Sequence, residues 1–223
     1  MSYTFDFSEM IYYAPAFLAA IVVTLRLTLL SCFFGTLLGF PIASLMLLPN
    51  PSGSIVTFVI HIVRAIPDLV LFFFFYYFPY REILGIQPPS PFGSAMLAMT
   101  TVLAVFSGDL FREAIRQSPR NQMLGVRAIG FKETQVFRHV ILPSVVRHTL
   151  PALMAFWIGI LKMSSLASVI GVNDTVYVAK IGMAQSYRSF EAWITVALIY
   201  IILVMPAIYG IRFFQHIPWM QRQ

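Results

Sequence analysis

Residues 108–151 have the sequence GDLFREAIRQSPRNQMLGVRAIGFKETQVFRHVILPSVVRHTLP, a long polar and basic segment in a chain that is otherwise strongly apolar. Seven of the fifteen Lys and Arg residues lie in it. Basic loops between hydrophobic spans stay on the cytoplasmic side of a membrane, so this segment predicts the topology. It also predicts two short helices: apolar residues over 123–129 end at Gly130, where a left-handed backbone is expected, and a second apolar set over 136–141 is closed by Pro143.

The composition places the whole chain in a membrane. Hydrophobic residues make up 59% and charged residues 11% of it, with a mean hydropathy of +0.80. Soluble domains carry about 25% charged residues, so we predict an all-α integral membrane protein. The net charge of +6 is explained by basic residues beside the spans rather than by a nucleic-acid partner. Cys32 is a lone cysteine and the four histidines lie far apart, so no metal site is expected.

We predict five transmembrane spans in a single domain covering residues 1–223. The expected spans are about 13–47, 54–79, 92–116, 145–172 and 191–214, with a cytoplasmic loop at about 117–144. An odd number of spans places the N-terminus outside and the C-terminus inside. Gly35, Gly39 and Pro41 indicate a packing face and a kink within the long first span. Residues 173–190 are expected to form an external, partly helical loop.

Five ionisable residues lie at membrane depth, where charge is costly and usually faces a cavity or another charge. They are Arg26, Arg64, Asp68, Asp109 and Lys162. Asp68 and Lys162 lie at similar predicted depth on different spans, which suggests a buried pair. Arg64 and Asp68, at i and i+4, are expected on one helix face, with Pro67 between them freeing a backbone carbonyl. An amino acid zwitterion would fit this arrangement, with its carboxylate on Arg64 and its ammonium on Asp68.

A structural role for the same charges stays open. Arg64, Asp68 and Lys162 would then lock helices together, and Asp109 is expected to anchor a helix to the loop rather than bind a ligand. The predicted substrate ligands, with that alternative beside them, are Arg64, Asp68, Lys162, Ser164 and Ser165. No catalytic residues are expected, since the spans lack motifs such as H-E-x-x-H.

Several motifs resemble those of one family. Aligned on Gly130, the chain is similar to the cytoplasmic motif of ABC importer permeases, E-A-A, three residues, G, nine residues, I-x-L-P: Val140 takes the isoleucine place and Leu142-Pro143 match. Arg64 and Pro67 resemble an F-R-x-x-P element. Further similarities, in the expected order, are Asp109 to Arg112, Ile160-Leu161-Lys162 with Ser164-Ser165-Leu166, and Phe190-Glu191 with Ala197 to Tyr200. The chain resembles the polar amino acid (His/Glu/Gln/Arg/opine) permeases.

This resemblance implies a type I ABC importer permease in the bacterial inner membrane. The implied function is the path for a polar amino acid or similar solute, delivered by an external binding protein. The implied partners are two ATPase subunits and a second permease subunit, with ATP and Mg²⁺ bound by the ATPases and no cofactor on this chain. The sequence has no G-x-x-x-x-G-K-[ST] phosphate loop of its own. A channel or accessory scaffold without ATP coupling is the alternative.

The loop departs from the family motif at one place. Where the family has Glu-Ala-Ala, this chain has Leu124-Gly125-Val126, and a glycine within a helix costs about 1 kcal/mol relative to alanine. The resemblance implies that the loop inserts into the ATPase, so the contact here is expected to rest on shape and on basic side chains. The altered motif favours a heterodimer with a second permease subunit whose motif is intact. The alternative is a neutral sequence change at a position that tolerates substitution. The predicted coupling residues are Leu124, Gly125, Arg127, Gly130, Lys132, Arg138, Leu142 and Pro143.

Overall fold

The structure is a computed structural model that describes residues 5–118, 120–128 and 130–215. These residues form helices and no strand, which confirms the all-α prediction. The helices are α1 (Ser8–Tyr12), α2 (Ala14–Met46), α3 (Ser52–Ala65), α4 (Asp68–Tyr77), α5 (Tyr80–Leu84), α6 (Pro91–Arg116), α7 (Arg120–Ala128), α8 (Glu133–Val136), the π-helix η1 (Phe137–Ile141), α9 (Leu142–Met163), the 3-10 helix η2 (Ser164–Ile170), α10 (Thr175–Ser186) and α11 (Ser189–Gln215).

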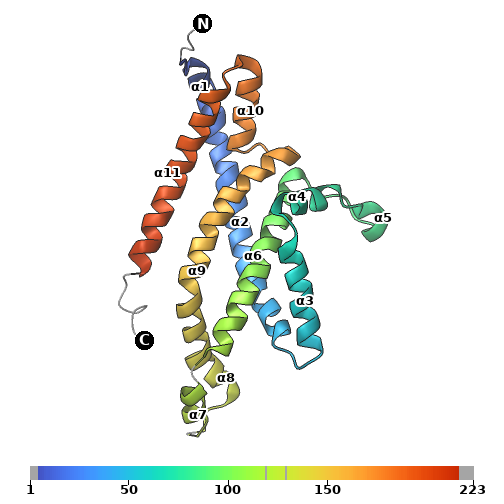
Figure 1. Cartoon of the computed structure of the whole chain (residues 1–223), viewed down its shortest axis with the longest axis vertical. Helices are drawn as coiled ribbons and strands as arrows, with labels where there is room; N and C mark the ends of the chain where they lie inside the picture. The colour runs from blue at the N-terminus through green and yellow to red at the C-terminus, as the bar shows by residue number, and fades with distance from the viewer. Residues whose placement is uncertain (1–4, 119, 129, 216–223) are drawn as a thin grey trace.

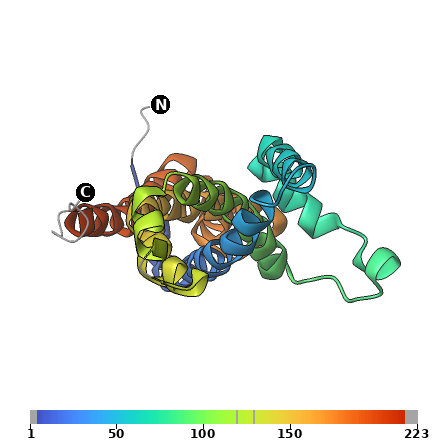
Figure 2. The same ribbon diagram turned by 90° about the horizontal axis from the view of Figure 1, so that it is seen from below.

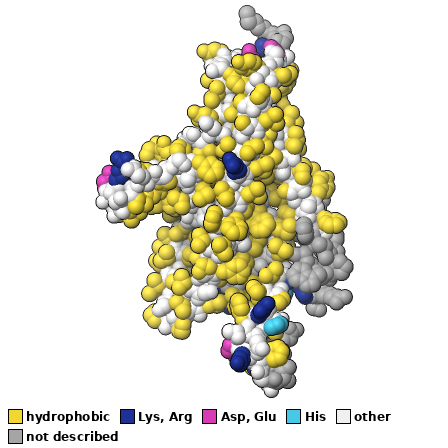
Figure 3. Space-filling model, turned by 180° about the vertical axis from the view of Figure 1, so that it is seen from behind, with side chains coloured by type: hydrophobic (Ala, Val, Ile, Leu, Met, Phe, Trp, Pro, Cys, Tyr) yellow, Lys and Arg dark blue, Asp and Glu magenta, His cyan; other side chains and the backbone are white. Residues whose placement is uncertain are grey.

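Four helical segments are long and apolar enough to cross a membrane: Ala14–Met46, Pro91–Arg116, Glu133–Ile170 and Ser189–Ile211. The bent pair of α3 and α4 brings the number to five if the two form one span. Figure 1 shows the long helices side by side, with α7 and α8 at the end opposite α1 and α10. Charged side chains on the face in Figure 3 lie mostly at the two ends and on a projecting arm, and the middle is almost wholly hydrophobic.

The predicted span 54–79 is not one continuous helix. It is broken between α3 and α4, whose axes differ in direction by 98°. Pro67 causes the break, because it lacks an N–H and disfavours helical backbone at the preceding residue. Ile66 accordingly has extended angles, with φ −75° and ψ 127°. Figure 2 shows α3, α4 and α5 standing to one side of the main bundle.

The first long helix packs closely against α6 through small residues, as the sequence predicted for Gly35 and Gly39. A Cβ added at Gly39 would lie 2.2 Å from Ser107 Oγ, and one at Gly108 would lie 2.4 Å from Ile42 Cγ2. The backbones are so close that Ser107 Oγ donates a hydrogen bond to Gly35 O at 3.0 Å. Close approach of small residues is a usual way for helices to associate in a bilayer. α2 and α6 therefore form the most extensive helix–helix contact in the described part of the chain.

The predicted external loop at 173–190 is partly helical, as expected, and contains α10. Asp174 begins this helix because its buried side chain accepts a hydrogen bond from the Tyr177 N–H at 2.8 Å. The apolar face of α10 then packs with the start of α2 and with α11, in a small core that includes Phe17, Val176 and Val196. A larger core between α2, α4, α6 and η2 includes Leu27, Phe72, Met99 and Leu103.

Candidate functional site

Two cavities lie beside the break between α3 and α4. The smaller has a volume of about 250 Å³ and is lined by Arg64, Asp68 and side chains of α6 and α9. The larger, of about 460 Å³, is lined by Asp68, Lys162, Ser165 and neighbouring residues of α9. Asp68, Phe156 and Met163 line both cavities, so the two are adjacent. A helix broken at membrane depth usually lines a binding cavity in transport proteins. The backbone N–H and C=O groups that lose their helical hydrogen bonds need other polar partners, which a cavity or its ligand provides.

Asp68 and Lys162 both line the larger cavity, but they do not form the buried pair that their predicted depths suggested. Both residues are exposed, and the ion pairs among the described side chains do not join them. The break at Pro67 explains the difference, because it turns α4 away from the line of α3 and leaves a space at the start of α4. Asp68 lies in the first turn of α4, where a carboxylate is favoured by the helix dipole. The space therefore has an anion and a cation open to it.

Arg64 does not share a helix face with Asp68, because the helix break separates them. Its Nη1 donates to Asp109 Oδ2 at 2.5 Å, and Asp109 Oδ1 also lies 3.4 Å from Arg112 Nη1. Asp109 thus ties the last turn of α3 to α6, which is a contact between two helices and not the helix-to-loop anchor expected for it. The Arg64 side chain stays 43% exposed and lines the smaller cavity, so only part of its guanidinium is engaged.

The two predicted serine ligands have different surroundings. Ser165 lines the larger cavity, and its hydroxyl donates to Lys162 O at 2.8 Å. Ser164 is fully buried, donates to Leu161 O at 2.6 Å and lies 3.4 Å from the Tyr200 hydroxyl of α11. Short hydroxyl side chains readily bond to the carbonyl three residues back, which suits the 3-10 turns of η2. Of the five predicted ligands, Ser164 is the one that lines neither cavity.

Sequence reasoning missed an aromatic wall. Phe106 of α6 and Phe156 of α9 stack with ring centroids 3.6 Å apart and planes 8° apart, and both line the smaller cavity. The two residues are fifty positions apart in apolar helices, so no local pattern distinguishes them from ordinary core phenylalanines. They add apolar surface to a cavity that Arg64 and Asp68 also line.

The turn at Gly130 has the left-handed backbone that the helix–glycine–helix pattern predicted. Gly130 has φ +90°. Its N–H donates to Arg127 O at 3.0 Å, and the Phe131 N–H donates to Val126 O at 3.2 Å. This pair of bonds is the Schellman motif, which ends a helix at a left-handed residue. Gly130 therefore sets the angle between α7 and α8.

An ion pair bridges the same turn. Arg127 Nε and Nη2 lie 2.8 Å from the two carboxylate oxygens of Glu133, a bidentate geometry. The sequence interpretation assigned Arg127 to a partner, but here it is engaged within the loop because Glu133 begins α8 directly across the turn. The exposed groups of the loop include Lys132 and Arg138, together with Leu124 and Phe137, which are 60% and 47% exposed.

Pro143 does not close the second short helix, contrary to the prediction. The segment from Glu133 to Ile170 runs on through it as one 38-residue helical stretch. A proline within a helix removes one hydrogen bond and its ring crowds the carbonyl four residues earlier. The π-helix at Phe137–Ile141 lies just before Pro143 and widens the helix at that place. α8 of the loop and the cavity residues Lys162 and Ser165 therefore lie on one helical column.

The comparisons with known proteins agree on one family. Residues 33–217 match the model of the "binding-protein-dependent transport system inner membrane component". The chain belongs to this family. It is 32% identical over 202 residues to a probable amino-acid ABC transporter permease protein, PatM, of Vibrio harveyi, covering 88% of each chain. It is 27% identical over 198 residues to the arginine ABC transporter permease protein ArtQ of Haemophilus influenzae, covering 86% of this chain and 89% of the relative.

Solved structures of two transporters share the fold. A chain in the crystal structure of an amino acid ABC transporter with histidines has a TM-score of 0.84 and 28% identity, with 96% of this permease and 99% of that chain covered. A chain of the inward-facing MetNI methionine ABC transporter has a TM-score of 0.74 at 22% identity, covering 96% and 97%. The permease therefore has the type I importer fold, and its family places it in the inner membrane.

The permease departs from its family motif at Gly125 without a structural need for glycine. A Cβ added at Gly125 would meet nothing within 4 Å. Leu124 beside it is exposed at the same end of the molecule. Nothing in the described part of the chain explains why glycine and leucine stand where the motif has alanine and glutamate.

Proposed function

We propose that this chain is the permease subunit of an ATP-driven importer of polar amino acids. The amino-acid permeases among its relatives support the substrate class, and the charged cavity supports it independently. One observation carries the proposal: Asp68 and Lys162 open onto one cavity without forming an ion pair with each other. A zwitterion placed between them would have its ammonium at Asp68 and its carboxylate at Lys162.

This assignment moves the carboxylate from Arg64 to Lys162. Arg64 is held by Asp109, so part of its guanidinium is no longer free to form a bidentate contact with a ligand. Ser165 lines the same cavity as Lys162 and its hydroxyl oxygen can accept a hydrogen bond. The stacked Phe106 and Phe156 give the apolar part of the path. We assign no catalytic role to any of these residues.

The energy for import would come from two ATPase subunits docked on α7, α8 and the turn between them. The chain has no phosphate-binding loop, so ATP and Mg²⁺ would be bound by those partners. Exposed Leu124 and Phe137 would enter the ATPase surface, with Lys132 and Arg138 as its basic rim. Because Glu133–Ile170 is one helical stretch, a shift of the loop would move Lys162 and Ser165 with it.

A second permease subunit and an external binding protein complete the proposed importer. We favour a heterodimer, because Leu124-Gly125-Val126 replaces the Glu-Ala-Ala of the family motif and an intact partner would compensate for it. The proposal is tested by reconstituting the complex in liposomes and measuring uptake of labelled polar amino acids with and without ATP. Uptake that needs ATP and the binding protein supports it, and solute flux that needs neither would make the chain a channel.

The proposed direction of transport depends on topology. With the basic loop inside, a reporter fused near Gln122 is expected to be cytoplasmic, and reporters near Ser90 and Asn173 are expected to be external. Alkaline phosphatase and green fluorescent protein fusions, active on opposite sides, measure this directly. An external position for Gln122 would separate the loop from any cytoplasmic ATPase.

The ion pair across the turn gives a test of loop shape. Glu133→Arg is expected to lower the amount of ATPase that co-purifies, because it sets two cations against each other beside Gly130. The charge swap Arg127→Glu with Glu133→Arg should restore it. Folding should change little, since exposed ion pairs contribute about 0–1 kcal/mol to stability. If the swap recovers no more ATPase than the single variant, Arg127 or Glu133 contacts the partner directly instead.

A further inference from the structure

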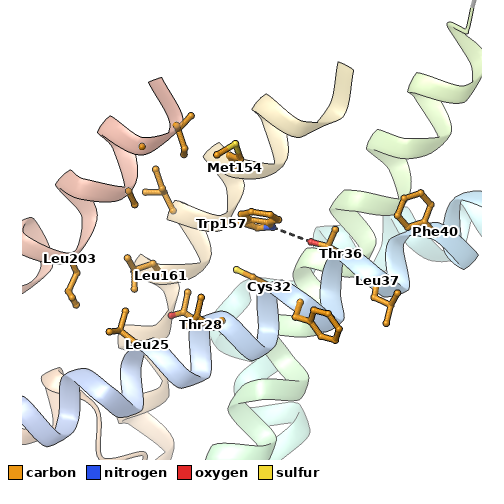
Figure 4. Close-up of a pocket in the computed structure, with 16 residues that line it drawn as sticks. Leu25, Thr28, Cys32, Thr36, Leu37, Phe40, Met154, Trp157, Leu161 and Leu203 are labelled. Carbon is orange, nitrogen blue, oxygen red and sulfur yellow. Dashed lines mark hydrogen bonds between the residues drawn. The ribbon is translucent and has the colours of Figure 1, made fainter. Parts of the chain in front are cut away.

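An apolar groove separate from the charged cavity runs between α2, α9 and α11. Its volume is about 720 Å³, and its walls include Leu25, Cys32 and Phe40 of α2, Trp157 and Leu161 of α9, and Leu203 of α11. Figure 4 shows these side chains along the groove, with Leu25, Leu161 and Leu203 together at one end and Phe40 at the other. None of the lining residues that the structure describes is charged. The groove is as long as several turns of α2.

The polar groups of the groove are already bonded within the protein. Trp157 Nε1 donates to Thr36 Oγ1 at 3.1 Å, and Thr28 Oγ1 donates to Thr24 O at 2.8 Å. A polar solute would therefore find no free charged partner along the described part of the walls. Water is disfavoured as well, because a buried water needs several polar partners. The walls fit a flexible apolar chain.

The groove opens toward the surface rather than into the bundle. Leu29 and Phe33 of α2, which also line the groove, are 67% and 63% exposed. In α11, only 11% of the apolar 18-residue stretch that would cross the membrane is buried against the rest of the chain. In a membrane this surface meets lipid tails or another transmembrane helix.

An arginine stands at one end of this surface. Arg26 follows Leu25, and with Leu29, Phe33 and Leu37 it occupies positions i, i+3, i+7 and i+11, which fall on one stripe of a helix. The Arg26 side chain is exposed, and it forms none of the ion pairs found in the described part of the chain. A cation on such an apolar helix needs an anion or water within reach.

The depth of Arg26 identifies the anion. α2 has 33 residues and is about 50 Å long at 1.5 Å per residue, so a hydrocarbon core of about 30 Å leaves about 10 Å of helix beyond it at each end. Arg26 is twelve residues after Ala14, about 18 Å along the helix and so about 8 Å inside the core. Side chains on a helix lean toward its N-terminus, so Arg26 can extend toward the headgroups at that end.

We propose that the groove is a phospholipid site, in which Arg26 binds the headgroup phosphate of the leaflet nearest the N-terminus of α2 and one acyl chain fills the groove. Guanidinium and phosphate form strong, often bidentate hydrogen bonds. An apolar slot with a cation at one end matches a molecule with an anionic head and a flexible tail. A partner helix would have to bring its own acidic residue to Arg26, at a cost of about 2.5–3.5 kcal/mol at the helix centre.

Native mass spectrometry of the intact complex tests the site. The complex is purified from membranes, exchanged into nanodiscs of 1-palmitoyl-2-oleoyl-phosphatidylglycerol and released, and the lipids retained per copy of this chain are counted. Arg26→Gln is expected to lower retention roughly tenfold, as for loss of one charge-assisted hydrogen bond. Arg26→Lys should keep most of it. Arg81→Gln, which removes an exposed arginine on α5, is the matched control and should change nothing.

A second variant tests the acyl chain. Gly210 lines the groove, and a Cβ there would meet nothing within 4 Å, so Gly210→Phe should fill the groove without disturbing the fold. It is expected to lower lipid retention even with Arg26 present. Unchanged retention in both Arg26→Gln and Gly210→Phe would overturn the proposal. Loss of the second permease subunit from Arg26→Gln, with lipid retention unchanged, would show that a protein partner covers this surface instead.

Discussion

Gly130→Val is expected to leave the protein in the membrane and to separate ATP hydrolysis from amino acid uptake. A Cβ at Gly130 would meet nothing within 4 Å, so the effect comes from the backbone alone. Residues other than glycine are penalised in the left-handed region by about 1–2 kcal/mol, and a β-branched side chain is disfavoured further. The Schellman bonds from Gly130 and Phe131 would be lost, and the angle between α7 and α8 with them.

The measurement is reconstitution with the partner subunits, scoring ATPase retention, ATP hydrolysis and uptake together. Uptake per ATP hydrolysed should fall about tenfold, the change that corresponds to about 1.4 kcal/mol. Gly85→Val is the matched control, because Gly85 also has a positive φ, +68°, and open space around it but lies at the end of α5, outside the coupling loop. If Gly130→Val keeps retention and coupling at the unmutated level, this turn is not the coupling element.

Asp68→Asn and Lys162→Gln are each expected to weaken amino acid stimulation of ATP hydrolysis by about tenfold to a hundredfold. Each variant removes one charge-assisted hydrogen bond to the zwitterion, worth about 1.5–3 kcal/mol. Because both residues would bind one molecule, their effects should be coupled, and the double variant should be less impaired than the product of the two. The readout is the amino acid concentration that gives half-maximal stimulation.

Ser164→Ala is the matched control for the cavity. Ser164 is a predicted ligand that faces Tyr200 rather than the cavity, whereas Ser165 lines it. The concentration for half-maximal stimulation should therefore change with Ser165→Ala and stay constant with Ser164→Ala. Independent effects of Asp68→Asn and Lys162→Gln, multiplying without coupling, would indicate that the two side chains do not act on the same molecule.

The sequence predicted those features that depend on local pattern. Hydropathy over about 20 residues is enough to find α2, α6, α9 and α11, because each lies in an apolar helical segment long enough to cross a membrane. Gly130 was predicted to be left-handed because it stands between two short amphipathic segments, and its φ of +90° confirms this. The glycines of α2 were recognised as a packing face from their spacing alone.

The features that the sequence did not predict depend on distant residues or on direction in space. Pro67 indicates a break, but the 98° bend depends on how α4 packs against α6 and η2. The contact of Arg64 with Asp109 joins residues 45 positions apart, so the spacing of Arg64 and Asp68 was misleading. A proline usually interrupts a helix, which is why Pro143 was expected to end one. The π-helix that precedes Pro143 lets the helix continue, and no clear pattern in the sequence predicts it.

We propose that the loop around Gly130 contacts an ATPase and transmits its movement to the charged cavity. Photo-crosslinking from p-benzoylphenylalanine at position 124 tests the contact most directly. Leu124 is 60% exposed on the loop, and Leu198 of α11, which is 54% exposed, gives a control position within a membrane span. We expect crosslinks from position 124 to an ATP-binding subunit in intact cells, and none to that subunit from position 198. If position 124 gives no crosslinks to that subunit, or if both positions give them equally often, the loop does not dock on the ATPase.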